Sequence, residues 1–159
     1  MIRRKPLRRV GKRGAIYKRL DKLLHELVVL RDGGVCRFGD RCPFRDKHSF
    51  TGRGFGLQAM HIYGKGAYPA LRYEPLNVIS GCGPVHAWWH QIGFGRESEE
   101  RRNVVRELCV SVLGADYLAR LDLFAHTRSR VDLEAVDLYL QLQIKALGNN
   151  ILDSPRAND

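Results

Sequence analysis

Four side chains between residues 57 and 91 have the types and spacings that chemistry requires. His86 and His90 are four residues apart, and on a helix this spacing puts both imidazoles on one face with Cβ atoms about 6 Å apart. Such a pair can bind one divalent metal ion. His61 stands in an otherwise apolar, strand-like stretch, and an unperturbed histidine pKa near 6.5 suits a general base at neutral pH. Asn77 could hold a loop or orient the His61 ring through a hydrogen bond.

Each of these features alone also has a purely structural explanation. One histidine of the pair could pack beside Trp88 or Trp89 while the other is solvated. A single histidine on a strand is usually a core or surface residue, and a single asparagine is usually a turn residue. The four residues therefore carry more weight as a group than they do singly.

The elements that must position these residues follow from hydrophobic periodicity. Leu20, Leu24 and Leu27 fall on one helix face, and Gly33 ends that helix. Pro75 interrupts an extended stretch, Pro84 suits the first turn of a helix, and Asp132 can cap another helix. The predicted helices cover residues 17–31, 84–90, 98–113, 115–125 and 132–147, and the predicted extended segments are 57–63 and 71–80.

Charge is concentrated at one end of the chain. The 159 residues contain 27 Lys and Arg against 17 Asp and Glu, a net charge of +10, and residues 1–20 hold nine of the cations and no acid. Residues 1–16 contain several helix breakers and predict a flexible basic arm, which would attract a polyanion by counterion release. The alternative is a solvated tail that aids solubility. The predicted nucleic-acid contacts are Arg3, Arg4, Lys5, Arg8, Arg9, Lys12 and Arg13, with Lys65 and Arg72 near the histidines.

The composition is that of a globular protein rather than a collagen-like or disordered one, with 44% apolar and 28% charged residues. The longest apolar runs are too short for a membrane span, and the basic N-terminus lacks the apolar segment of a secretory signal. We therefore expect an intracellular protein that does not act in a membrane. In that compartment the four cysteines favour metal binding or simple burial over disulfides.

The order of a strand histidine, a loop, an asparagine and a helix histidine resembles the HNH nucleases, also called ββα-metal or His-Me finger nucleases. Residues 57–62 (LQAMHI) and 71–77 (LRYEPLN) are similar to a pattern of phage and prophage HNH proteins. Residues 82–86 (CGPVH) stand where that family usually has Cys-x-x-Cys-His. The similarity covers about residues 32–147 and is nearest to phage recombination nucleases of the NinG/Rap and Ref types.

The resemblance implies an α+β fold with a small ββα-metal centre and an irregular, zinc-knuckle-like loop, flanked by an N-terminal helix and C-terminal helices. It implies that His61 is the general base that activates water and that Asn77 braces the ββ loop. It also implies that His86 and His90 bind a divalent cation (Mg²⁺, Mn²⁺ or Zn²⁺), which stabilises charge on the phosphate and on the leaving 3′ oxygen.

One departure from the family concerns the active-site metal. Many HNH nucleases have Asp or His just before the base, where this chain has Met60. A thioether is a poor ligand for Mg²⁺, which prefers oxygen. Gln58 or Glu74 could contribute a ligand instead, or His61 could itself be a ligand.

A second departure concerns a structural zinc, which family members often hold with two cysteine pairs. Cys36 and Cys42 form the first pair here, but the second is reduced to Cys82 because Val85 takes the last place. A closed zinc site needs four ligands, and His48 is the nearest candidate by sequence. The alternative is a decayed knuckle whose cysteines are small buried apolar residues. Cys109 lies on an apolar helix and is expected in the core.

The sequence thus predicts a metal-dependent HNH-like DNA endonuclease of phage or prophage origin, acting in recombination or DNA processing in the bacterial cytoplasm. The predicted organisation is a basic arm (1–16), an N-terminal helix plus HNH-like core (17–95), a helical region (96–148) and a frayed tail (149–159). The C-terminal helices would pack against the hairpin or form a homodimer face, and a recombination protein could activate cutting. The rivals are a decayed HNH scaffold that binds nucleic acid and a zinc-stabilised interaction module. The sequence leaves open the form of the nucleic acid and the physiological metal.

Overall fold

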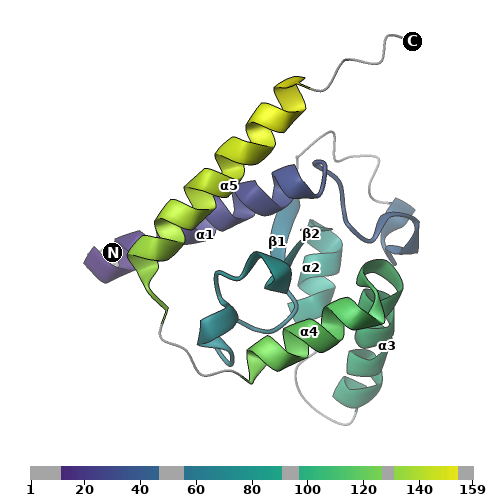
Figure 1. Ribbon diagram of the computed structural model, residues 1–159. Helices are drawn as coiled ribbons and strands as arrows, with labels where there is room; N and C mark the ends of the chain where they lie inside the picture. The colour runs from purple at the N-terminus through teal and green to yellow at the C-terminus, as the bar shows by residue number, and fades with distance from the viewer. Residues whose placement is uncertain (1–11, 47–55, 91–96, 127–130, 154–159) are drawn as a thin grey trace, which may run out of the picture.

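The computed structural model describes residues 12–46, 56–90, 97–126 and 131–153 and has an α+β architecture (Figure 1). This confirms the predicted fold class. Within the described residues, five α-helices surround a two-stranded antiparallel sheet. The helices are α1 (Lys12–Arg31), α2 (Gly83–His90), α3 (Glu97–Leu113), α4 (Ala115–Ala125) and α5 (Leu133–Asp153), and the strands are β1 (Leu57–His61) and β2 (Val78–Cys82).

Helix α1 begins at Lys12, so the prediction that the chain remains an irregular arm as far as residue 16 is wrong. Gly14 lies inside the helix, although glycine costs about 1 kcal/mol relative to alanine there. Ile16 and Tyr17 pack against the core and offset this cost. Lys12 and Arg13 therefore belong to α1, whereas the predicted contacts Arg3, Arg4, Lys5, Arg8 and Arg9 lie outside the described residues.

The C-terminal helix is also longer than predicted. Asp132 caps it as expected, because its Oδ1 accepts hydrogen bonds from the amides of Glu134 (3.0 Å) and Ala135 (3.1 Å). Gly148 does not end it, and α5 continues to Asp153, so residues 149–153 are helical rather than frayed. Helix α5 packs in the same core cluster as α1 through Leu140, Ile144 and Leu147. A single glycine costs a helix only about 1 kcal/mol, so Gly148 does not stop it.

The segment predicted to be extended over residues 71–80 is only partly so. Two short 3₁₀ turns, Pro69–Leu71 and Pro75–Asn77, precede β2. Each turn has proline in its first position, where the fixed φ of proline suits a helical turn. The paired strand β2 therefore begins only at Val78 and runs directly into α2.

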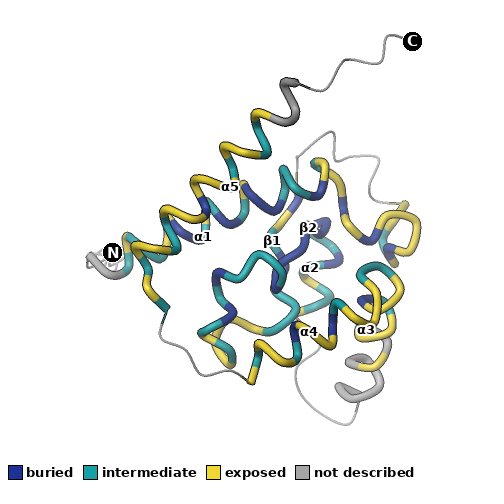
Figure 2. Tube along the Cα trace, viewed as in Figure 1, coloured by how far each residue is buried: buried dark blue, intermediate teal, exposed yellow. Residues whose placement is uncertain are grey.

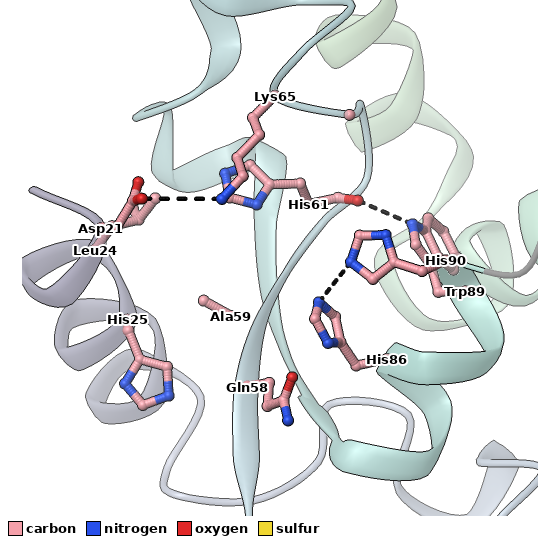
Figure 3. A pocket seen from close by; sticks show the side chains of 11 residues that line it. Asp21, Leu24, His25, Gln58, Ala59, His61, Lys65, His86, Trp89 and His90 are labelled. Atoms are coloured by element: carbon pink, nitrogen blue, oxygen red, sulfur yellow. Dashed lines mark hydrogen bonds and ion pairs between the residues drawn. The ribbon is translucent and has the colours of Figure 1, made fainter. Parts of the chain in front are cut away.

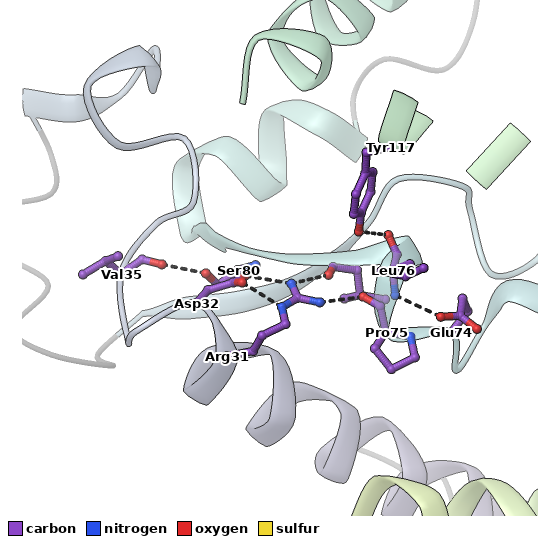
Figure 4. A network of polar contacts seen from close by, with 9 residues as sticks. Arg31, Asp32, Val35, Glu74, Pro75, Leu76, Ser80 and Tyr117 are labelled. Atoms are coloured by element: carbon purple, nitrogen blue, oxygen red, sulfur yellow. Dashed lines mark hydrogen bonds and ion pairs between the residues drawn. The ribbon is translucent and has the colours of Figure 1, made fainter. Parts of the chain in front are cut away.

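The outer edge of β2 is closed by side chains and a loop amide in place of a third strand. The Arg31 guanidinium donates to the carbonyl of Val78 (2.8 Å), and the Asp32 carboxylate accepts from the amide of Ser80 (2.8 Å). The amide of Arg37 donates to the carbonyl of Ser80 (2.8 Å). Arg31 also binds Asp32 and the carbonyl of Pro75, so one network ties the end of α1 to β2 (Figure 4). These bonds allow all five residues of β2 to be buried.

The outer edge of β1 is closed in the same manner, by one side chain of α1 and one of α2. His25 of α1 hydrogen-bonds through Nε2 to the carbonyl of Leu57 (3.0 Å). The indole of Trp89 of α2 donates to the carbonyl of His61 (3.0 Å). Residues Leu57 and His61 of β1 pair with Cys82 and Val78 of β2, so these capped carbonyls lie at the two ends of the ladder.

Two apolar clusters pack around the sheet, and Figure 2 shows the trace of β2 coloured as buried. On one side, Leu20, Leu24 and Val28 of α1 pack with Val78 and with Leu140 of α5. On the other side, Met60, Ile79 and Val85 pack with the three cysteines Cys36, Cys42 and Cys82. Cys109 of α3 is buried in a third cluster, as predicted for a core residue.

The C-terminal helices divide between two parts of the core. Helix α5 packs along α1, whereas α4 meets the turns before β2, where the Tyr117 hydroxyl donates to the carbonyl of Leu76. Asp122 of α4 accepts from the Tyr63 hydroxyl in the loop after β1. In the described part of the chain, none of the helices combines the length and apolar character that crossing a bilayer requires.

The Arg31–Asp32 network predicts that losing its aspartate destabilises the fold far more than losing the aspartate of an exposed Arg–Asp pair. Asp32→Ala should lower the free energy of unfolding by about 3 kcal/mol, because it leaves a partly buried guanidinium and a buried strand amide without their partner. The Asp32 side chain is 3% exposed. Asp40→Ala is the matched control, since Asp40 pairs with Arg45 but is 84% exposed. Urea unfolding should give a lower midpoint for the first variant only, and equal midpoints would contradict this account of the sheet edge.

Candidate active site and cysteine cluster

A cleft of about 460 Å³ lies along β1, between α1 and α2 (Figure 3). Helix α1 contributes Asp21 and His25, and α2 contributes His86, Trp89 and His90. The floor includes Gln58, Ala59 and His61 of β1, and Lys65 follows from the next loop. The three histidines singled out in the sequence, His61, His86 and His90, therefore line one cavity.

His61 is oriented by a backbone carbonyl. Its Nε2 lies 2.9 Å from the carbonyl oxygen of Arg72, and because a carbonyl can only accept, Nε2 carries the proton. The other ring nitrogen, Nδ1, is thereby left with a lone pair. Burial, together with the nearby Lys65 ammonium group, lowers the pKa of His61 below its usual range. A neutral imidazole with a free Nδ1 is the form that a general base requires.

Asn77 is fully buried and holds the connection between β1 and β2. Its side-chain oxygen accepts from the amide of Tyr63 (2.8 Å), and its Nδ2 donates to the carbonyls of Tyr63 and Leu71 (3.0 Å each). Its backbone carbonyl accepts from the amide of Ile62 (2.8 Å). Asn77 does not line the cleft; its contacts flank His61 and Arg72 and so fix the geometry between them.

His86 and His90 face each other on α2, with Nε2 atoms 2.9 Å apart. Two ligand atoms that bind one ion at about 2.1 Å and at right angles are about 3.0 Å apart, so the pair could chelate a divalent cation. Among the described residues, no third His, Cys, Asp or Glu joins them in a metal-binding group. A cation on this pair would keep positions open for water or for substrate oxygens.

The cations and acids near the cleft are already partly engaged. The Arg72 guanidinium donates to the Asp21 carboxylate (2.8 Å) and stacks over the rings of Tyr17 and Tyr73, and Lys65 lies 3.9 Å from Asp21. Glu74, considered as a metal ligand, instead caps the turn that follows it by accepting from the amide of Leu76. Gln58 does line the cleft.

Two cleft residues, Asp21 and His25, were not singled out from the sequence. They lie four residues apart beside the apolar face of α1, the same spacing as His86 and His90. That spacing was the available signal. It carried no weight in the sequence because nothing there places α1 beside β1.

The second cluster of reactive side chains consists of Cys36, Cys42 and Cys82, whose sulfur atoms lie within 4.8 Å of one another. All three are buried and free. The Sγ atoms of Cys42 and Cys82 are 3.7 Å apart, far longer than a disulfide bond of about 2.05 Å. This sulfur–sulfur distance is close to the distance of about 3.8 Å between two thiolates on one tetrahedral zinc. The three cysteines could therefore bind a metal ion such as zinc.

Without a metal ion, the buried thiols of Cys42 and Cys82 keep their protons, so a bound ion would have to displace them. Burial raises the pKa of Cys42 to about 12 and also raises that of Cys82. Val85, which stands where a fourth cysteine is usual in the resembling family, is fully buried against this cluster. His48, the other suggested ligand, lies outside the described residues.

Comparison of the chain with models of known protein families, with curated proteins and with solved structures finds no match. A functional assignment therefore depends on the geometry of the histidine cleft and of the cysteine cluster. The cleft brings the His61 imidazole and the His86–His90 pair into one cavity, and the three cysteines form a separate group that could hold a metal ion.

The half-buried rings of His61 and His86 predict that the stability of the protein depends on pH. Burial is the main cause of the lowered pKa of both His61 and His86 in the folded protein, whereas the unfolded chain titrates near pH 6.5. Below that pH the unfolded state binds more protons than the folded state, so stability falls as the pH is lowered. Urea midpoints measured at pH 7.5 and 6.0 should drop for the parent and drop less for the double variant His61→Gln, His86→Gln. The same drop in both would contradict the burial of these rings.

Proposed function

We propose that the protein is a divalent-metal-dependent endonuclease that hydrolyses phosphodiester bonds in DNA by an HNH-type mechanism. The observation that carries this proposal is the shared cleft. An imidazole with a free Nδ1 lies in the same cavity as a histidine pair whose nitrogens have the separation of two ligands on one cation. Phosphodiester hydrolysis needs both groups on different walls of one cleft.

The chemistry assigns one role to each group. His61 takes a proton from water at Nδ1, the water oxygen attacks phosphorus, and the bond from phosphorus to the 3′ oxygen breaks. His86 and His90 would hold the cation, which would supply positive charge for the phosphate oxygens and the leaving oxygen. The released 3′ oxygen would take a proton from solvent. Asn77 fixes the loop that carries the Arg72 carbonyl, and this carbonyl keeps the proton of His61 on Nε2.

The charge of the chain supports a polyanionic substrate. Residues 1–20 hold nine cations and no acid, and Lys65 stands at the cleft. Contacts of this kind bind the phosphate backbone without reading sequence. The resemblance to phage nucleases extends the proposal to recombination or DNA processing in a bacterial host, with a recombination protein as the expected partner.

The cysteine cluster is proposed to hold a structural zinc. Cys82 ends β2 and immediately precedes α2, whereas Cys36 and Cys42 lie in the segment that follows α1. A metal on these thiolates would fix the start of α2 and hence the direction in which His86 and His90 point. His48 or a solvent molecule would complete the four ligands of zinc.

One observation favours the alternative of a nucleic-acid-binding protein on a decayed HNH scaffold. Met60 takes the place of a usual metal ligand, and its side chain is fully buried among Ile79 and Val85. It therefore belongs to the core and cannot reach a cation in the cleft. The active-site metal would have two protein ligands, and weak metal binding would leave DNA affinity without cleavage.

The zinc assignment predicts a selective effect of removing one thiol. Purified parent should carry one zinc by native mass spectrometry, and Cys82→Ser should lose it, because two thiolates do not hold zinc tightly. Cys109→Ser is the matched control, since Cys109 is equally buried but lies in a different cluster. Zinc retained by Cys82→Ser, or absent from the parent, would refute the site.

The nuclease assignment predicts nicking of supercoiled plasmid with Mg²⁺ or Mn²⁺ and none with EDTA. His61→Ala should reduce the rate at least about 100-fold, because it removes the base. His86→Ala should raise the metal concentration needed for half-maximal rate. His126→Ala controls for the loss of a histidine, since His126 follows α4 and does not line the cleft. A folded parent that binds DNA but never nicks it would favour the decayed scaffold.

A further inference from the structure

Asp21 lies outside the hairpin–helix unit, on α1, yet it faces the same cleft as His61 (Figure 3). Its carboxylate accepts from Nε of Arg72 at 3.3 Å and from a terminal guanidinium nitrogen at 2.8 Å. Lys65 approaches the same carboxylate at 3.9 Å. Two cations from the loop between the strands are therefore held by one acid of a different element.

Arg72 connects this acid to the base. The guanidinium is 24% exposed and lies 4.7 Å from the ring centre of Tyr17 and 5.3 Å from that of Tyr73, so its position is fixed from three sides. The backbone carbonyl of the same residue accepts a hydrogen bond from His61 Nε2 at 2.9 Å. A displacement of the Arg72 side chain would shift the carbonyl that sets the His61 tautomer.

We propose that Asp21 is a positioning residue for His61, acting through Arg72: the Asp21 carboxylate anchors the guanidinium, and the Arg72 carbonyl then holds the imidazole with Nδ1 free. The inference rests on the proposed function, because it assigns His61 the role of base. It extends the site from the ββα unit to the N-terminal helix α1.

The charge of Asp21 distinguishes this role from substrate binding. A carboxylate in a cleft that takes a phosphodiester repels the substrate and occupies Lys65 and Arg72, so it weakens binding. Its benefit then has to lie in the chemical step. Removing the charge should lower kcat, because the base is less well oriented, and should leave KM unchanged or lower it, because two cations become free for phosphate.

The test compares the same Asp→Asn substitution in two ion pairs of α1, one with the loop between the strands and one with α5. Asp21→Asn removes the charge beside Arg72, and Asp137→Asn is the matched control, because Asp137 pairs with Arg19 of α1 at 2.9 Å but lies away from the cleft. Arg72→Gln breaks the same link from its other end and keeps the backbone carbonyl. Asp21→Glu keeps the charge and should therefore lie between Asp21→Asn and the parent in kcat and in the His61 signals.

Two measurements are made on each folded variant. The ¹⁵N signals of the imidazole nitrogens in metal-free protein report which nitrogen of His61 carries the proton. Initial rates of Mg²⁺-dependent plasmid nicking give kcat and KM. For Asp21→Asn and Arg72→Gln we expect His61 signals shifted toward a mixture of tautomers and a kcat lower by about tenfold. Asp137→Asn should match the parent in both measurements.

The outcomes separate this inference from the proposed function. Parent-like His61 signals and kcat in Asp21→Asn, with nicking intact, would overturn the positioning role and leave the nuclease standing. A parent that does not nick DNA would remove the proposed function, and the tautomer signals would still decide whether Asp21 orients the ring. A lower kcat accompanied by a higher KM would also contradict the proposal, because it would indicate lost binding.

Discussion

A sheet of two strands has two open edges, and the way in which this protein closes them determines the rest of its structure. Buried backbone groups need hydrogen-bond partners, and no third strand supplies them in the described part of the chain. Arg31 and Asp32 close the edge of β2, and His25 and Trp89 close that of β1. Because these side chains come from the ends and faces of α1 and α2, satisfying the strands also fixes where the two helices lie. Burial of the whole of β2 then follows, and with it the two apolar clusters on either face of the sheet.

The cleft is a consequence of the same arrangement. Helices α1 and α2 approach β1 from opposite sides, and the strand between them becomes the floor of a cavity. His25 and Trp89, which close the edge, also line it. A site built this way depends on the junction between β2 and α2, where Cys82 and Val85 pack with Cys36 and Cys42. The proposed zinc would act at that junction, so the cysteine cluster and the cleft are linked through one short helix.

Electrostatics inside the cleft differ from those of the chain as a whole. The protein carries +10, which suits a polyanionic partner, whereas the cleft holds a neutral His61 and an acid, Asp21, that engages the two nearest cations. In the proposed function, the long-range charge would bring a polyanion to the surface, and the local arrangement would set which nitrogen of His61 carries the proton. A fully cationic cleft would bind phosphate more tightly but would leave the Arg72 side chain without its anchor.

The amino-acid sequence was enough to predict the α+β class, most helices and the capping of α5 by Asp132. It also drew attention to Asn77 and to His61, His86 and His90, and these three histidines line one cleft. The helices, the cap and the His86–His90 pair follow from periodicity, local capping and short spacings, which depend on neighbours along the chain. His61 and Asn77 gained weight only through the resemblance of their order to that of the HNH nucleases. The start of α1 at Lys12 and the extension of α5 past Gly148 could not be predicted, because one glycine costs a helix only about 1 kcal/mol and the contact between the two helices is not visible in the sequence. The folded structure alone places Asp21 and His25 at the cleft, gives Glu74 the role of a turn cap, buries Met60 in the core and orients His61 toward the Arg72 carbonyl. Except for the turn cap, each of these depends on contacts between segments far apart in sequence, and a pattern along the chain carries no information on the distance between such segments.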